Sequence, residues 1–297
     1  MLQFVIDVLI RTSDIMLVAV GLSVVYSLVK FPNIAHVQYA MVGAFAPLGF
    51  SHLGLPFPFA VLLSCVCTGV LAVVLHALIF KRLLRGGSSI AMIGSLAISM
   101  IVVAFVLGIA GSRPLRYTTA LPAPFQVGDT SISLDQLTSI GLGVGCLCLL
   151  ALLLFRTGVG RSMRAMSSNP ALAAATGVNG SLVVAGITFL SGVLAALGGT
   201  MLGLTESVHI SLGSNLLLPV FAAAILGGLG NPLGAAAGAL LIALTETFVT
   251  SMDLGWVFGT PNVYLPITYI SAASFLILLV VLLFKPYGIF DKEIRRV

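Results

Sequence analysis

This sequence is poor in charged residues: Lys, Arg, Asp and Glu make up only 8% of its 297 residues. Water-soluble globular domains carry about a quarter charged residues. Hydrophobic residues account for 59% of the chain, and the mean hydropathy is +1.17. The composition therefore excludes a soluble globule and indicates a polytopic membrane protein.

Motifs for nucleotide binding and hydrolysis are also absent. The sequence contains no G-x-x-x-x-G-K-[ST], so it has no P-loop for ATP. Gly141-x-Gly143-x-Gly145 lies inside an apolar run and does not follow a strand, so it is not a dinucleotide fingerprint. No H-E-x-x-H or buried carboxylate pair indicates an intramembrane hydrolase. We expect a non-enzymatic chain with no catalytic residue, no metal site and no cofactor of its own.

Cysteine is scarce, and its four copies form Cys65-Val-Cys67 and Cys146-Leu-Cys148 inside apolar runs. Residues two apart on a helix point in different directions, so we expect packing rather than a metal site or disulfide. Acidic and basic residues are missing from the middles of the clearest apolar runs. A proton-coupled carrier usually needs an ionisable group there. Energy for any transport is therefore expected to come from another protein.

Long apolar runs are what the sequence has in abundance. A spanning helix needs about 18 or more apolar residues, and the clearest such runs are 55–80, 90–110, 136–155, 181–204 and 263–284. Shorter runs broken or flanked by Gly, Pro or a charge lie at 10–29, 35–51, 215–229 and 233–252. Such segments can be tilted, broken or re-entrant. We predict an all-α transmembrane bundle of about 8–10 membrane segments, folded as a single domain over 1–297.

Basic residues gather in short loops and predict the orientation of the bundle. By the positive-inside rule, the clusters beginning at Lys81, Arg156 and Lys285 are cytoplasmic. The stretch 111–135 carries Asp129, Asp135 and several prolines and is expected outside. The net charge of +5 then reports orientation and not a nucleic-acid partner. The resulting topology has an external N-terminus and nine candidate crossings, fewer if a short segment is re-entrant.

The basic loop 156–180 contains the signals of a short helix. Asn169 is a good N-cap, Pro170 suits the first helical position, and Gly177 can end the helix in a left-handed conformation. Helices this short do not hold in water on their own, so the segment implies a docking partner. An ordinary interhelical loop with good caps would also fit these residues.

Polar residues and glycines at membrane depth provide further candidates. His36 and Gln38 fit either a gate or pore-facing role or internal hydrogen bonds, and Asn33 also fits a capping role. Asn231-Pro232 interrupts a run rich in Gly and Ala, which predicts two tilted or half-depth helices that meet at a glycine corner. The corner could face a cavity or serve close helix packing.

The remaining charges near helix ends fit positions at the membrane interface. Asp7, Arg11 and Asp14 recur along one helical face, where we expect them to pair with one another. Interfacial placement is also expected for the acidic residues and the histidine that flank the external loops, namely Glu206, His209, Glu246 and Asp253.

Taken in order, four motifs resemble the permease subunits of branched-chain amino-acid ABC importers, of the short-permease type. Gly21-Leu-Ser-Val-Val-Tyr26 with Pro32-Asn-Ile-Ala-His36 is similar to the family's first helix and its N-F-A-H element. The loop and corner motifs are Gly160-Arg-Ser-Met-Arg-Ala165 with Ala173-Ala-Ala-Thr-Gly-Val-Asn179, and Leu226-Gly-Gly-Leu-Gly-Asn-Pro-Leu-Gly234. Lys285-Pro-Tyr-Gly-Ile-Phe290 is similar to the closing motif. The family usually continues N-F-A-H with Gly and Glu, whereas Val37 and Gln38 follow here, which leaves the substrate open.

The resemblance implies a heteromeric importer in a bacterial plasma (inner) membrane. Its other parts would be a second related permease chain, a pair of cytoplasmic ATP-binding subunits that carry ATP and Mg, and an extracytoplasmic solute-binding protein. This chain would convert ATP hydrolysis into alternating access for branched-chain amino acids or related small amphipathic solutes. The short helix at 170–176 would be the coupling helix, and the residues implied in coupling are Arg161, Arg164, Ala165, Asn169, Pro170, Ala173, Ala174, Gly177, Val178 and Asn179. The candidate path or gate residues are Asn33, His36, Gln38, Gly227, Gly228, Gly230, Asn231 and Pro232.

Two other functions remain compatible with the residues. A stand-alone secondary carrier or channel would transport a small solute without an ATPase. Urea, an amide or an organic acid is also a possible substrate of the ABC importer that the resemblance implies. A membrane scaffold subunit would tolerate bulky substitutions in the Asn33–Gln38 and Gly227–Pro232 segments.

Overall fold

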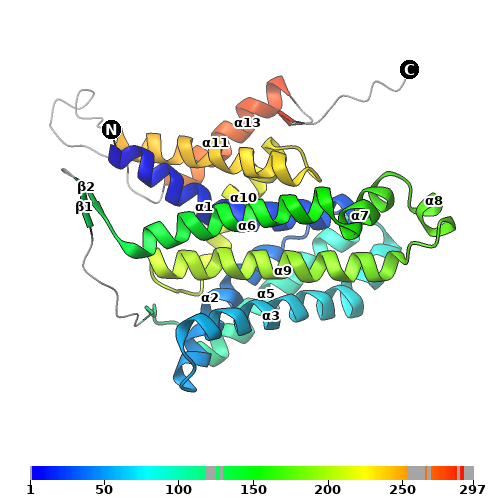
Figure 1. The fold of residues 1–297 in the computed structure, drawn as a ribbon, viewed down its shortest axis with the longest axis horizontal. Helices are drawn as coiled ribbons and strands as arrows, with labels where there is room; N and C mark the ends of the chain where they lie inside the picture. The colour runs from blue at the N-terminus through cyan, green and yellow to red at the C-terminus, as the bar shows by residue number, and fades with distance from the viewer. Residues whose placement is uncertain are drawn as a thin grey trace.

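A computed structural model describes residues 2–117, 125–127, 130–252, 265, 269–285 and 288–290. Nine helices of 15 residues or more form one bundle in this part of the chain (Figure 1). They are α1 (Leu2–Val29), α2 (His36–His52), α3 (Phe57–Leu75), α5 (Ser88–Ala110), α6 (Leu134–Arg156), α9 (Gly180–Thr205), α10 (Leu212–Leu226), α11 (Pro232–Ser251) and α13 (Ile270–Phe284).

Shorter elements join or extend these helices. The helix α3 continues through a π-helical turn, η1 (His76–Phe80), into α4 (Lys81–Leu83) and the 3₁₀ turn η2 (Leu84–Gly86). The segment between α6 and α9 forms α7 (Gly158–Ser168) and α8 (Pro170–Ala175). Two antiparallel strands, β1 (Phe125–Val127) and β2 (Thr130–Ile132), precede α6.

The nine long helices confirm the predicted all-α membrane bundle. Six of the described helical segments, including the continuous Phe57–Gly86, are long and apolar enough to cross a membrane. The helices α10 and α13 are shorter apolar helices of 15 residues each. One expectation was wrong: the run 10–29 is not a short interrupted segment, because α1 is a continuous helix of 28 residues that begins at Leu2.

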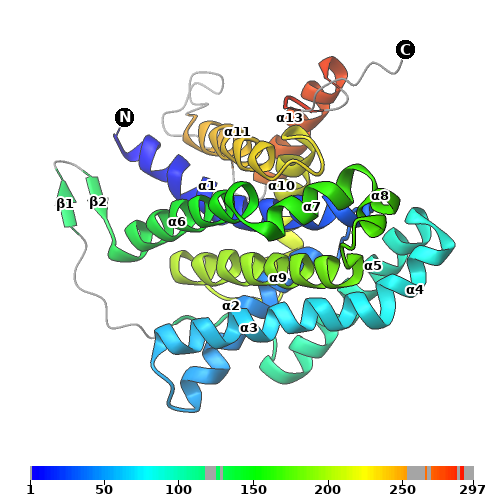
Figure 2. The ribbon, with the colours of Figure 1, turned by 45° about the vertical axis from the view of Figure 1, so that its right-hand side comes forward.

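The helix α1 forms the core of the bundle. Every residue from Thr12 to Val25 is buried, and α1 packs against α6, α9, α10 and α11. The N-terminus and the β1–β2 hairpin lie at one end of the bundle, and α7 and α8 lie at the opposite end (Figures 1 and 2). This arrangement agrees with the predicted topology, in which those ends are external and cytoplasmic. The outer helices α3, α5 and α6 expose many large apolar side chains, as a lipid-facing surface requires.

Small residues allow α2 and α9 to pack with their backbones almost in contact. A Cβ atom built on Gly199 would lie 1.8 Å from the Ala40 carbonyl oxygen, and one built on Gly43 would lie 2.2 Å from the Ala196 Cα atom. These are main-chain atoms, so a side chain at either glycine would have to push the two helices apart. Close approach through small residues is the usual way in which membrane helices gain packing energy.

We therefore predict that Gly199→Ala destabilises the bundle by about 1–3 kcal/mol, the usual cost of overpacking a well-packed core. Gly186→Ala on the same helix is the matched control, because a Cβ atom at Gly186 would meet nothing within 4 Å. Thermal unfolding of the purified protein in detergent, followed by size-exclusion chromatography, compares the two variants. Equal melting temperatures would contradict the close helix contact.

Candidate functional site

Local hydrogen bonds define the short helix that the sequence predicts in the basic loop 156–180. The Asn169 side-chain oxygen accepts a hydrogen bond from the Leu172 amide at 3.0 Å, and Pro170 occupies the first turn of α8. Gly177 has φ of 85°, and its amide donates to the Ala174 carbonyl at 3.0 Å. The predicted short helix and its stop at Gly177 are therefore confirmed. The sequence reasoning missed α7, which turns the first half of the loop into an amphipathic helix.

The helix α8 packs against the rest of the chain at one residue, and its other residues are exposed. Ala173 is buried, and the Val178 amide donates to its carbonyl at 3.0 Å. Its neighbours on either side are exposed: Leu172 is 64% exposed, and Ala174 is exposed as well. In the described structure, α8 thus exposes small apolar residues. It lies at the end of the bundle opposite the N-terminus, which is the predicted cytoplasmic end (Figure 2).

The basic and polar residues around α8 have different local roles. The Arg164 guanidinium donates to the Leu154 carbonyl and lies 5.8 Å from the centroid of the Phe155 ring. Arg161 and Ala165 are exposed on α7. Asn179 caps α9, because its side-chain oxygen accepts from the Leu182 amide at 3.3 Å.

The candidate path residues of α2, His36 and Gln38, lie deep in the bundle, where each is 2% exposed. The His36 Nε2 atom lies 3.0 Å from the Val18 carbonyl oxygen, and Nδ1 lies 3.3 Å from the Ser191 hydroxyl. The Gln38 amide nitrogen donates to the Ser99 hydroxyl at 3.0 Å, whereas its Oε1 atom is buried without a hydrogen-bond partner. The side chains of His36 and Gln38 thus contact different helices.

Asn33 has a turn-forming role in the link between α1 and α2. Its side-chain oxygen accepts from the Ala35 amide at 3.1 Å, and its carbonyl accepts from the His36 amide at 3.2 Å. The expectation that Asn33 itself caps α2 was off by two residues, because Ala35 occupies the N-cap position.

The predicted glycine corner joins α10 to α11. Gly228 and Gly230 have φ of 91° and 93°, values that only glycine adopts freely. The Asn231 side chain caps α11 through the Gly234 amide at 3.1 Å, and Pro232 begins the helix. A Cβ atom on Gly227 would lie 2.1 Å from the Gly234 carbonyl carbon, so the two helices meet with their backbones in contact.

The loop and the corner both contact the C-terminal end of α1 at Ser27. The Ser167 hydroxyl of α7 donates to the Ser27 carbonyl at 2.9 Å. A Cβ atom on Gly230 would lie 3.4 Å from the Ser27 Cα atom. The structure therefore brings α7 and the corner together at one point of α1. It does not bring His36 or Gln38 to that point.

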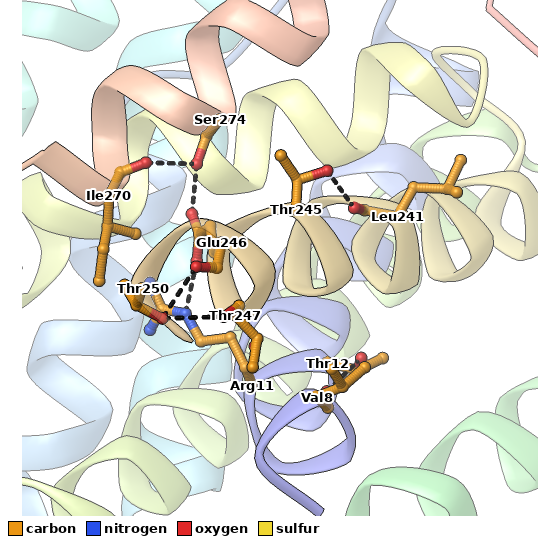
Figure 3. Close-up of polar contacts among 10 residues, drawn as sticks. All are labelled: Val8, Arg11, Thr12, Leu241, Thr245, Glu246, Thr247, Thr250, Ile270 and Ser274. Carbon is orange, nitrogen blue, oxygen red and sulfur yellow. Dashed lines mark hydrogen bonds and ion pairs between the residues drawn. The ribbon is translucent and has the colours of Figure 1, made fainter. Parts of the chain in front are cut away.

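An ion pair that the sequence reasoning missed joins the first half of α1 to α11 (Figure 3). The Arg11 Nε atom of α1 donates to a Glu246 carboxylate oxygen of α11 at 2.6 Å. The Ser274 hydroxyl of α13 donates to the other carboxylate oxygen. Glu246 is only 2% exposed, so the interfacial placement expected for it was wrong. The expected pairing of Arg11 within its own helix was also wrong, because its partner is 235 residues away.

The other residues that were expected at the membrane interface beside the external loops are Glu206, His209 and Asp253. Glu206 is exposed at the end of α9, as expected, and His209 is half-buried with its Nδ1 atom 2.8 Å from the Ser207 carbonyl oxygen. Asp253 lies outside the described residues. Within the described part of the chain, no three His, Cys, Asp or Glu residues gather closely enough to hold a metal ion.

Comparison with known proteins identifies the fold's family. A family model described as "Branched-chain amino acid transport system / permease component" matches residues 4–284. The chain belongs to this family. It is a transport permease that crosses the plasma membrane several times, which the sequence resemblance had indicated.

Curated relatives of the permease match nearly end to end. A probable branched-chain amino acid transport permease protein LivH of Methanocaldococcus jannaschii is 29% identical, over 95% of this chain and 90% of the relative. The high-affinity branched-chain amino acid transport system permease protein BraD of Pseudomonas aeruginosa is 28% identical, over 100% of this chain and 98% of the relative. LivH of Escherichia coli is 26% identical, over 95% of this chain and 92% of the relative.

Proposed function

We propose that this permease is the membrane subunit of an ATP-driven importer for branched-chain amino acids or related small amphipathic solutes. The observation that carries the proposal is the capped α8 helix, which exposes apolar residues on a chain without a P-loop. The names of the relatives support the substrate class. The proposed partners are a second permease chain, cytoplasmic ATP-binding subunits that hold ATP and Mg, and an extracytoplasmic solute-binding protein. Residues 1–297 would act as one membrane domain.

In this proposal, α8 docks into the ATP-binding subunit, and α7 transmits its movement. The Ser167–Ser27 hydrogen bond of 2.9 Å links α7 to the end of α1. Gly230 lies against the same residue, so a displacement of α7 would reach the α10–α11 corner through a single helix end. The corner residues Gly227, Gly228, Gly230, Asn231 and Pro232 would allow α10 and α11 to change their angle.

The proposed translocation path of the solute runs past α2. Gln38 is the better candidate for a substrate contact, because its Oε1 atom is a buried acceptor without a partner and so has hydrogen-bonding capacity to spare. Both ring nitrogens of His36 already have partners. His36 and Asn33 would therefore position α2 and its entry turn.

We predict that Gln38→Leu lowers uptake by up to about tenfold, the loss expected for one hydrogen bond to the solute. Ser99→Ala is the control, because it removes a partner of the Gln38 amide and leaves the amide itself in place. Initial uptake rates at matched membrane abundance compare the two variants. Wild-type uptake by Gln38→Leu would show that Gln38 only packs in the bundle and does not contact the solute.

The experiment that tests the proposed function is uptake of radiolabelled leucine by cells that carry or lack this chain. Uptake that requires the chain, and that stops when the ATP-binding subunit is inactivated, supports the proposal. Competition by unlabelled isoleucine and valine but not by urea or benzoate supports the substrate class. Uptake that persists without the ATP-binding subunit would indicate a carrier or channel instead.

A further inference from the structure

A groove opens between α3 and α9 at the predicted cytoplasmic end of the bundle. Its volume is about 590 Å³. Its walls come from the end of α1, the segment α3–η1–α4–η2, Met166 of α7 and the first turns of α9. Most of its lining is apolar, and the contributing side chains from the two main walls include Val73, Ala77, Leu84, Val184 and Ala185.

The groove is reached from the lipid-facing surface of the bundle. Beside the groove, Val74 of α3 and Leu78 of η1 are 43% and 58% exposed. On the α9 side, Leu182 is 71% exposed. An apolar hollow between outward-facing helices is filled by acyl chains in a bilayer, because water is excluded there.

The polar rim of the groove is positively charged. Lys81 lines it, whereas Arg82 and Arg85 on the same segment do not. The first turn of the 26-residue helix α9 adds the positive end of a helix dipole. Within the described residues, the acidic side chains belong to the external half of the predicted topology: Asp7, Asp14, Asp135, Glu206 and Glu246. Nothing acidic among the described residues therefore compensates Lys81.

The backbone at the rim is unusual as well. The α-helical hydrogen bonding of α3 gives way to the π-helical turn His76–Phe80, directly before Lys81. Such turns are rare and occur often at functional sites. Here the turn supplies His76 and Ala77 to the lining, next to Lys81.

We propose that this groove binds one phospholipid with an anionic headgroup from the cytoplasmic leaflet. Its phosphate lies against Lys81 and the first turn of α9, and one acyl chain follows Val73, Ala77, Val184 and Ala185. Basic pockets between membrane helices on the cytoplasmic side commonly bind such headgroups. The groove is next to α7, so the lipid would brace the segment that carries α8.

The test is lipid retention by the full-length chain, measured by native mass spectrometry after equilibration with phosphatidylglycerol or phosphatidylcholine of identical acyl chains. We expect about fivefold tighter binding of phosphatidylglycerol, in keeping with the contribution of one lysine near an anionic surface. Lys81→Gln should remove most of that preference. Ala185→Phe should lower retention of both lipids because it fills the groove.

Two variants serve as matched controls that should retain lipid like the wild type. Arg85→Gln removes a charge of the same cluster from a residue that does not line the groove. Leu62→Phe adds bulk to α3 at a residue that is 63% exposed and does not line the groove. Equal binding of the two lipids, or unchanged retention in both Lys81→Gln and Ala185→Phe, would overturn the proposal. Loss of the ATP-binding subunit from these variants with unchanged lipid retention would instead assign the groove to protein docking, and would also overturn it.

Discussion

Ala174→Glu is expected to reduce uptake to background while the chain still inserts and folds. Ala174 is exposed on α8, so the new carboxylate meets solvent when this chain is alone. In the proposed complex, the same carboxylate would be buried against the ATP-binding subunit without a counter-charge, which costs about 3–5 kcal/mol. The measurement is leucine uptake together with the elution profile of the variant in detergent.

A matched pair of variants separates docking from folding. Ala174→Ser keeps the site small and neutral and should retain uptake. Gly177→Pro should abolish uptake by a different route, because proline fixes φ near −65°, whereas Gly177 has φ of 85°. Proline also removes the amide that bonds the Ala174 carbonyl. Full uptake by Ala174→Glu or Gly177→Pro would rule out α8 as the coupling helix.

Arg11→Leu is expected to destabilise the bundle by about 3–5 kcal/mol, because it leaves the buried Glu246 carboxylate without its partner. The carboxylate is 2% exposed and joins α1, α11 and α13 through Arg11 and Ser274 (Figure 3). A loss of this size lowers the melting temperature by roughly 5–15 °C for a chain of this length. Thermal unfolding in detergent provides the measurement.

Removing both charges isolates the cause of that loss. Arg11→Leu combined with Glu246→Leu should recover much of the stability, because replacement of a whole buried ion pair by apolar residues is often neutral. Asp7→Asn on the same helix is the surface control, since the Gln3–Asp7 hydrogen bond is exposed. An unchanged melting temperature for Arg11→Leu would mean that the pair contributes little to holding α1 against α11.

Local signals in the sequence predicted a large part of this structure. The cap at Asn169 and the left-handed stop at Gly177 are set by residues within one or two turns, and both are present as expected. The break at Asn231–Pro232 is equally local, because the capping amide belongs to Gly234. Apolar runs located the long helices because a bilayer requires continuous apolar length.

Long-range pairing was the part that the sequence could not predict. Arg11 and Glu246 are 235 residues apart, and each taken alone resembles an interfacial charge near a helix end. Their contact depends on how α1 packs beside α11, which no local pattern specifies. The hydrogen bond of Gln38 could not be predicted for the same reason, because its partner Ser99 lies on another helix, 61 residues away.

The most direct measurement is a gentle detergent pull-down of this chain, tagged in its native host, with mass spectrometry of the proteins that remain bound. The proposed function predicts recovery of P-loop ATP-binding subunits together with a second permease, and loss of those ATP-binding subunits with Ala174→Glu but not with Ala174→Ser. Recovery of the folded chain alone, in mild detergent and from cells that show uptake, would contradict the importer and favour a carrier or channel that works without an ATPase.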